Sequence, residues 1–195
     1  APTALSLPVV SVDDFEAYEG MLVTFPQMLF ISEYFDYDRY GEIVLTSQRF
    51  STPTAVYEPG MDAVAAAEDY LLNKITLDDG RTVQNPDPAI HPNGEVFDLT
   101  NLFRGGDTVT NVTGVLDYSF GLYRIQPTQG ADYTSANPRT DAPDEVGGNL
   151  KVASFNVLNY FTTIDTGAWI CGPAQDQECR GADTRGEFDR QRAKI

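Results

Sequence analysis

The run L-K-V-A-S-F-N-V-L-N-Y-F at residues 150–161 decides how the rest of this sequence is interpreted. Its apolar, β-branched and aromatic residues extend over the length that is typical of a strand in the core of a sheet. Two asparagines, Asn156 and Asn159, interrupt the apolar composition. Because a buried amide needs hydrogen-bond partners, one interpretation is a core strand that delivers amides to a site at its end. The simpler alternative is a strand-terminal asparagine that bonds its own turn.

The same run is similar to the first strand of the endonuclease/exonuclease/phosphatase superfamily, which includes deoxyribonuclease I-like enzymes. More narrowly, the chain resembles large secreted bacterial nucleases in which an OB-like domain precedes the catalytic domain. This resemblance implies that Asn156 is the motif asparagine that helps to place the catalytic aspartate and the metal. It also places Asn159 nearby, as a contact to the nucleic acid.

Hydrolysis in that superfamily uses a histidine pair, acidic metal ligands and an asparagine–aspartate set that orients water and phosphate. A divalent cation neutralises the phosphate, and fixed hydrogen bonds hold the scissile group. The sequence has one histidine, His91, far from residues 150–195. The resemblance therefore implies a parent enzyme that hydrolyses DNA with Mg²⁺ or Ca²⁺. This chain is interpreted as an N-terminal fragment, with its catalytic domain cut at Ile195, that holds no metal and is inactive alone.

Residues 1–126 contain short strand-like runs separated by turns. We expect strands within residues 19–32, 42–47, 75–77, 109–115 and 122–126, and a helix from Ala63 to Asn73 capped by Asp62. This pattern predicts a mainly β fold, namely a five-stranded OB-like Greek-key barrel with one helix. A β-sandwich fragment is the alternative. Residues 127–149 are predicted to be a linker, and residues 150–195 the first strand and truncated start of an α/β sandwich domain.

Two smaller features of residues 1–126 are interpreted as connections. Asp78-Asp79-Gly80 is predicted to be a hairpin turn. The proline-rich segment from Val83 to Gly94, which contains His91, is predicted to be an irregular surface loop.

Aromatic residues and arginine alternate near the end of the predicted barrel, at Tyr118, Phe120, Tyr123 and Arg124. OB folds stack bases on such aromatic side chains and hold the strand with cations. These four residues are therefore candidates for nucleic-acid binding. The alternative is that they pack within the core and the hairpin.

The charge of the chain opposes a nucleic-acid partner. Asp and Glu number 29 against 13 Lys and Arg, which gives a net charge of −16. Because phosphate contacts come from Lys and Arg, we expect weak or no nucleic-acid binding by this chain alone. From Arg180 onward the balance reverses, with five bases and three acids. This basic tail either faces DNA in the complete enzyme or is the solvated start of a helix.

Cys171 and Cys179 lie eight positions apart in a polar loop, and two thiolates alone make a poor zinc site. We expect a disulfide, which favours a secreted or extracellular bacterial protein, with the periplasm and the cell surface as related possibilities. Two free thiols in a cytosolic protein are the alternative. No apolar run approaches 18 residues, so membrane insertion is not expected. The sequence leaves the oligomeric state open.

Two other functions remain compatible with the sequence. One is a stand-alone extracellular OB-fold binding module without enzymatic activity. The other is a phosphatase or phospholipase of the same superfamily. Sequence beyond Ile195 would separate them, because an apolar strand ending in Glu, followed by Asp and His motifs, selects the nuclease.

Overall fold

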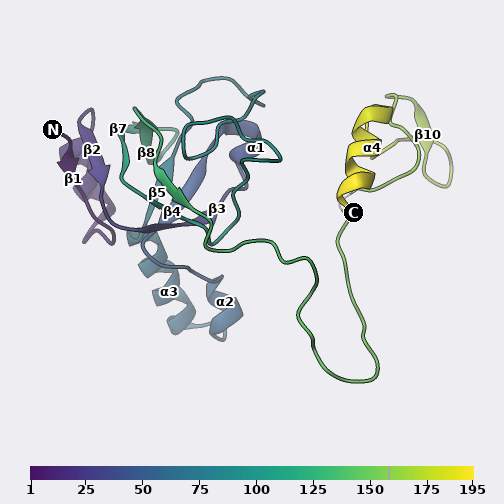
Figure 1. The fold of residues 1–195 in the computed structure, drawn as a ribbon, viewed down its shortest axis with the longest axis horizontal. Helices are drawn as coiled ribbons and strands as arrows, with labels where there is room; N and C mark the ends of the chain where they lie inside the picture. The colour runs from purple at the N-terminus through teal and green to yellow at the C-terminus, as the bar shows by residue number, and fades with distance from the viewer. Residues whose placement is uncertain (158) are drawn as a thin grey trace. The chain divides into compact units, whose positions relative to one another are not determined.

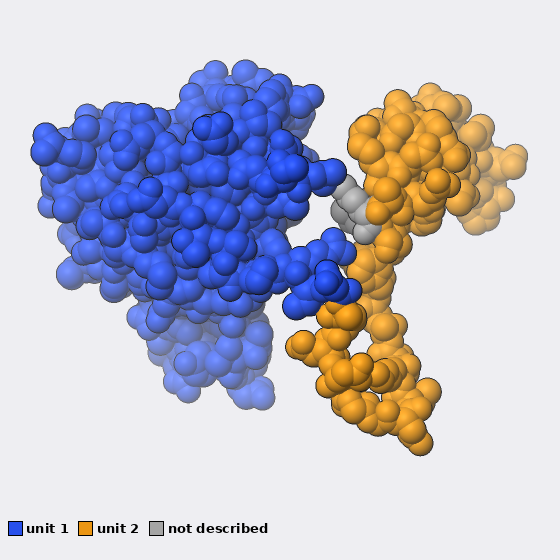
Figure 2. Space-filling view, in the orientation of Figure 1, with its two compact units in different colours: residues 1–141 blue, residues 142–195 orange. Residues whose placement is uncertain are grey.

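The computed structural model describes residues 1–157 and 159–195. The chain divides into two compact units, residues 1–141 (unit 1) and residues 142–195 (unit 2), which are coloured separately in Figure 2. Unit 1 contains a large sheet and the helices α1–α3, whereas unit 2 contains a small hairpin and the helix α4 (Figure 1).

Nine strands of unit 1 form one mixed sheet in the order β1-β2-β7-β8-β5-β4-β3-β6-β9, curled like a half barrel. Neighbouring strands are antiparallel except in the pairs β1–β2 and β5–β8, which are parallel. The strands are β1 (Thr3–Ala4), β2 (Leu22–Phe25), β3 (Leu29–Glu33), β4 (Ile43–Thr46), β5 (Lys74–Leu77), β6 (Thr108–Thr110), β7 (Val112–Ser119), β8 (Leu122–Pro127) and β9 (Asp132–Thr134).

The prediction of a mainly β, five-stranded OB-like barrel is therefore wrong, because the fold is a mixed α/β one built on a nine-stranded sheet. The short edge strand β1 lies near the N-terminus, where no strand was expected, and β9 lies in the predicted linker. Two or three residues are too few to reveal a period-two pattern. The parallel pairing of β5 with β8 joins segments far apart in the chain, which no local pattern reports.

The individual central strands agree better with their predictions. Strands β4, β5 and β8 lie where strands were expected, which confirms those local predictions, whereas the single strand expected at residues 109–115 is divided between the end of β6 and the start of β7. Alternate side chains enter the core, as with Val23 and Phe25 of β2, which are fully buried. Each such side chain contributes about 1.5–3 kcal/mol relative to an exposed one. The buried set also includes Leu29, Ile31, Ile43, Leu45, Ile75, Val109, Val112, Leu116 and Ile125.

Four helices accompany the sheet. They are a 3-10 helix (Val12–Tyr18), α1 (Tyr37–Tyr40), α2 (Pro53–Val56) and α3 (Met61–Leu72). Helix α3 confirms the predicted helix, but its N-cap is Gly60, so Asp62 lies in the first turn and not at the cap. Ser11 caps the 3-10 helix and forms a capping box with Asp14.

Unit 2 has a hairpin of β10 (Trp169–Cys171) and β11 (Gln177–Glu178), followed by α4 (Arg185–Lys194). Helix α4 lies in the basic tail and agrees with the interpretation of that tail as the start of a helix. Its N-cap is Thr184, whose hydroxyl accepts a hydrogen bond from the backbone N–H of Glu187 at 3.2 Å. Among the described residues, no helix has both the length and the apolar composition to cross a membrane.

Candidate functional site

Residues 150–157 and 159–161, which include Asn156 and Asn159, do not form the core strand that was expected for them. Residues 151–157 form no strand and are exposed, and Leu158 lies outside the described residues. Asn156 and Asn159 are both exposed, and Asn159 has a left-handed backbone with φ of 49°. A strand requires a partner that accepts and donates its backbone hydrogen bonds. Within the described part of unit 2, the strand pairing is that of β10 with β11, and residues 151–157 take no part in it.

Helix α4 contacts the end of this run. The ring of its buried Phe188 stacks on Tyr160, with centroids 5.4 Å apart and planes 13° apart. Gln191 Nε2 donates to the carbonyl of Val157 at 3.3 Å. The arginines of α4 remain exposed, and the ion pairs of Arg185, Arg190 and Arg192 are with Glu187 and Asp189 of the helix itself. The segment that carries the asparagines is therefore followed by a helix that packs on it.

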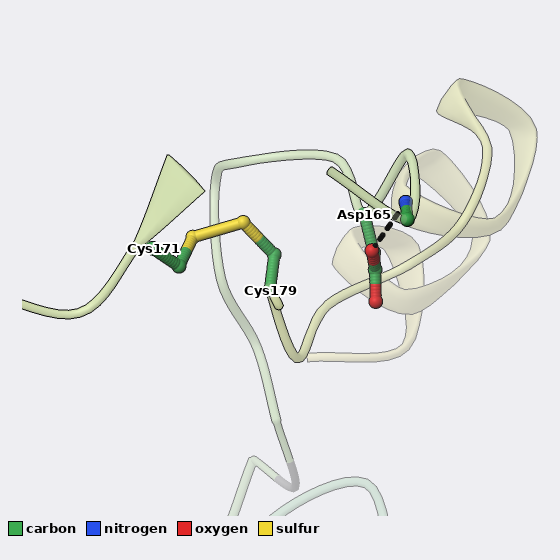
Figure 3. The surroundings of a disulfide bond; sticks show 4 residues. Asp165, Cys171 and Cys179 are labelled. Carbon is green, nitrogen blue, oxygen red and sulfur yellow. Dashed lines mark hydrogen bonds between the residues drawn. A yellow bond between two sulfur atoms is a disulfide. The ribbon is translucent and has the colours of Figure 1, made fainter. Parts of the chain in front are cut away.

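A disulfide closes the hairpin between the run and α4. Cys171 and Cys179 are bonded, with their Cα atoms 5.2 Å apart (Figure 3). Nearby, Asp165 accepts a hydrogen bond from the backbone N–H of Gly167 at 2.9 Å (Figure 3). The bond predicted from the two cysteines is thus present, and Cys179 is buried beneath it.

The four aromatic and arginine candidates of unit 1 meet at the β7–β8 hairpin. Tyr118 and Tyr123 are cross-strand partners whose rings lie 4.7 Å apart. Phe120 occupies the turn with φ of 52° and is 94% exposed. Tyr123 donates its hydroxyl to Glu16 at 2.8 Å, and this bond raises the pKa of Tyr123 to about 12. The surface around the two tyrosines is consequently acidic.

Arg124 lies beneath this hairpin and is only 3% exposed. Its Nη1 contacts Glu42 at 2.7 Å and Asp78 at 2.9 Å, and its Nη2 donates to the carbonyl of Ser119. The Phe120 ring covers the guanidinium, with Cζ 5.4 Å from the ring centroid. Two carboxylates therefore neutralise Arg124 inside the fold, and its guanidinium is not presented to an external phosphate.

Sequence reasoning missed this ion-pair group. Asp78-Asp79-Gly80 was interpreted as a hairpin turn, but Asp78 is buried and pairs with Arg124 on the parallel neighbour strand. Asp79 is also partly enclosed, and its burial raises its pKa. The available signal was two consecutive carboxylates directly after an apolar strand, but Arg124, the partner of Asp78, lies 46 positions away in the chain.

The prediction that His91 lies in a surface loop is also wrong, because its side chain is 1% exposed. Its ring packs edge-on against Tyr133 and Phe103, with centroids 4.5 and 5.6 Å away. Nδ1 accepts from the backbone N–H of Asn93 at 3.1 Å. Burial lowers the pKa of His91, which favours the neutral ring. The proline-rich segment is therefore a loop that packs on aromatic side chains, although its proline content predicted a surface position.

The metal implied by the superfamily resemblance does not fit the residues present. Throughout residues 1–157 and 159–195, no three His, Cys, Asp or Glu side chains converge in a way that could hold a metal ion. We therefore derive no catalytic step through a metal within these residues.

Comparison with known proteins adds one relationship. No curated protein and no solved structure matches the chain. One family, described as a domain of unknown function (DUF8508), matches residues 8–138, which make up nearly all of unit 1. Since this match covers more than half of the sequence, the chain belongs to the DUF8508 family.

Proposed function

We propose that this chain is part of a secreted, metal-dependent nuclease that hydrolyses phosphodiester bonds of DNA. Residues 150–195 begin its catalytic domain, and unit 1 is an accessory domain that precedes it. The observation that carries the proposal is the run K-V-A-S-F-N-V-L-N-Y-F at residues 151–161. The helix that follows it, α4, supports the proposal because the resemblance calls for a strand followed by a helix.

The active site of this nuclease needs residues from other parts of the parent protein. The superfamily uses a histidine pair, whereas this sequence has one histidine, which is buried in unit 1. Within residues 1–195 the proposal therefore assigns one catalytic position, Asn156. Its amide donates and accepts hydrogen bonds, which suits a group that fixes a neighbouring carboxylate or a phosphate oxygen.

The proposal also explains why residues 151–157 are exposed and form no strand. A core strand of an α/β sandwich is stabilised by neighbouring strands and by helices on both faces. Without them, the exposed side chains of Val152 and Phe155, 88% and 71% exposed, have nothing to pack on. In the complete catalytic domain we expect both side chains to be buried, which would turn the asparagines toward one end of the sheet.

The test is a plasmid-cleavage assay on the complete parent protein with Mg²⁺ and, separately, with Ca²⁺. We expect cleavage in at least one metal, and a loss of about 10²–10³-fold in rate for Asn156→Ala, the size measured for removal of one positioned hydrogen-bond group. Asn149→Ala, an exposed asparagine of the same unit, is the matched control and should keep full activity. A parent protein that cleaves no DNA, or an Asn156→Ala variant as active as the control, would overturn the proposal.

The same assay separates the related chemistries of the superfamily. A phosphatase would release phosphate from a monoester such as p-nitrophenyl phosphate and leave plasmid intact. A phospholipase would act on a phospholipid vesicle. The 195-residue chain by itself should be inactive on all three substrates.

A further inference from the structure

A small polar cavity of about 340 Å³ lies in unit 1 beside the ends of β3 and β6, and no part of the proposed function uses it. Arg49 and Arg104 line it together with two consecutive glycines, Gly105 and Gly106, and with the aromatic residues Tyr34 and Phe50. We call it the Arg49–Arg104 cavity. Its lining contains no Asp or Glu.

This composition is unusual for a chain with a net charge of −16. Four other cavities of unit 1, of about 350, 450, 390 and 620 Å³, each have at least one carboxylate in their lining. Within the described residues, the guanidinium groups of Arg49 and Arg104 take part in none of the ion pairs. Two arginines without carboxylate partners among the described residues therefore line the same cavity.

The glycines bring the backbone close to these groups. Gly106 has φ of +91°, and a Cβ added there would lie 3.3 Å from Nη1 of Arg49. A Cβ added at Gly105 would lie 3.2 Å from the ring of Tyr34. The absence of a side chain at both positions lets the guanidinium and the aromatic ring approach the loop closely, and a Cβ at either position would make that contact tight.

The loop is held in place before any ligand arrives. Asp107, which is 1% exposed, accepts hydrogen bonds from the backbone N–H groups of Arg104, Ala136 and Asn137 at 2.7–2.9 Å. Asn137, which also lines the cavity, donates its Nδ2 to the carbonyl of Gly105 at 2.7 Å. These bonds fix the backbone from which Arg104 projects, and preorganisation of this kind lowers the cost of binding.

The aromatic rings are held by edge contacts. Tyr34 packs edge-on against Phe103 with centroids 5.7 Å apart, and Phe50 packs against Tyr70 at 5.2 Å. Guanidinium groups bind phosphate through paired hydrogen bonds, and aromatic faces stack on nucleobases. The cavity volume lies in the range of about 300–1,000 Å³ that is usual for small-ligand sites.

We propose that the Arg49–Arg104 cavity binds a nucleotide, with its phosphate on the two arginines and its base against Tyr34 or Phe50. The nucleotide is either a free mononucleotide or one unit of a single strand. The inference goes beyond the proposed nuclease, since it concerns binding by unit 1 and needs no catalytic group.

Isothermal titration of the 195-residue chain with adenosine 5′-monophosphate tests it, in parallel with adenosine and with inorganic phosphate. We expect the monophosphate to bind, adenosine to bind at least tenfold more weakly, and the affinity for the monophosphate to fall as salt rises. Arg49→Gln/Arg104→Gln should weaken binding at least tenfold. Arg49→Lys/Arg104→Lys should recover part of it, because lysine keeps the charge but loses the paired geometry. Arg39→Gln, an exposed arginine that rests on Tyr40 outside the cavity, is the matched control.

No binding of the monophosphate, or equal binding by the double Gln variant and the Arg39→Gln control, would overturn the proposal. Equal affinity for inorganic phosphate and the monophosphate would overturn the stacking of the base. Competition by a single-stranded oligothymidylate would assign the site to a strand, and its failure to compete would assign it to a free nucleotide. Because the readout is binding without hydrolysis, these results are distinguishable from failure of the nuclease assay.

Discussion

Arg124 illustrates how a single buried charge constrains unit 1. Its side chain is 3% exposed, and the side chains of its partners Glu42 and Asp78 are 16% and 6% exposed. Removal of one member of a buried ion pair leaves a charge without compensation, which is more destabilising than replacement of the whole group by apolar residues. The group therefore couples β8 to the residues that flank β4 and β5.

We expect Arg124→Met to lower the free energy of unfolding of unit 1 by about 3–5 kcal/mol, measured by urea denaturation. The triple variant Glu42→Gln/Asp78→Asn/Arg124→Met should regain most of this loss, because no charge is left unpaired. An Arg124→Met variant within 1 kcal/mol of the wild type would contradict the assignment of a buried ion pair.

The lowered pKa of Asp107 predicts that the stability of unit 1 depends on pH. Burial acts to raise the pKa of Asp107, but hydrogen bonds from Tyr133, Asn137, Arg104 and Ala136 together hold it below its usual value. An Asp whose pKa is lower in the folded protein than in the unfolded chain, where it is about 3.9, stabilises the fold at pH values above 3.9. This stabilisation is lost as the pH falls from there through the pKa of the folded protein. Asp107→Asn should therefore destabilise unit 1 at pH 7, and its difference from the wild type should shrink below about pH 4. A difference that is constant from pH 7 to pH 3 would count against this linkage.

At the scale of elements, the β7–β8 pair depends on a close approach of two backbones. A Cβ added at Gly114 of β7 would lie 2.2 Å from the carbonyl oxygen of Gln126 and 2.7 Å from Cγ2 of Ile125, both on β8. Gly114→Ala should consequently lower the thermal stability of unit 1, by the roughly 1–3 kcal/mol that overpacking costs, or more. Gly60→Ala, where the nearest atom is 3.9 Å from the added Cβ, is the control without overpacking, and because Gly60 is the N-cap of α3 it should cost about 1 kcal/mol or less. Equal melting temperatures for the two variants would contradict this expectation, because they would mean that β7 and β8 accommodate a side chain at Gly114 without loss of stability.

The disulfide has a comparable role for the hairpin of unit 2. The bond closes a loop between positions eight apart in the chain, which the loop-entropy relation converts to about 2–3 kcal/mol. Cys171→Ser/Cys179→Ser should make residues 165–182 more sensitive to trypsin, which cleaves at Arg180, while unit 1 keeps its melting temperature. Unchanged digestion of unit 2 would contradict this role.

At the scale of the whole molecule, the two units differ in how much they bury. The buried residues of the described core cluster all lie between Leu7 and Ala131, within unit 1. Residues 142–157 are exposed throughout. Because exposed segments are cleaved first, we expect brief proteolysis to cut between residues 139 and 157 and to leave a stable fragment that contains unit 1. Earlier cleavage inside residues 20–134 would contradict this order.

Several central strands and the helix α3 were predictable because local patterns fix them, whereas the 3-10 helix, α1 and α2 were not predicted. Alternation of apolar residues places Val23 and Phe25, or Ile43 and Leu45, on the same face of a strand whatever their neighbours are. In the same way, cysteine spacing predicted the disulfide of Cys171 and Cys179, and the acidic balance of the chain is a property of its composition.

Strand partners, burial of charge and the grouping of distant side chains were decided by the tertiary structure. The parallel pairing of β5 with β8 brings Arg124 to Asp78, and the folding of a proline-rich loop encloses His91. Likewise, Arg49 and Arg104 are 55 positions apart in the sequence and share a cavity only because the chain returns to the end of β3. The sequence by itself determined several central strands and the helix α3, because those preferences are local, but it did not reveal the short strands β1 and β9 or the short helices α1 and α2. Which segments meet depends on long-range packing, and no single stretch of sequence contains that information.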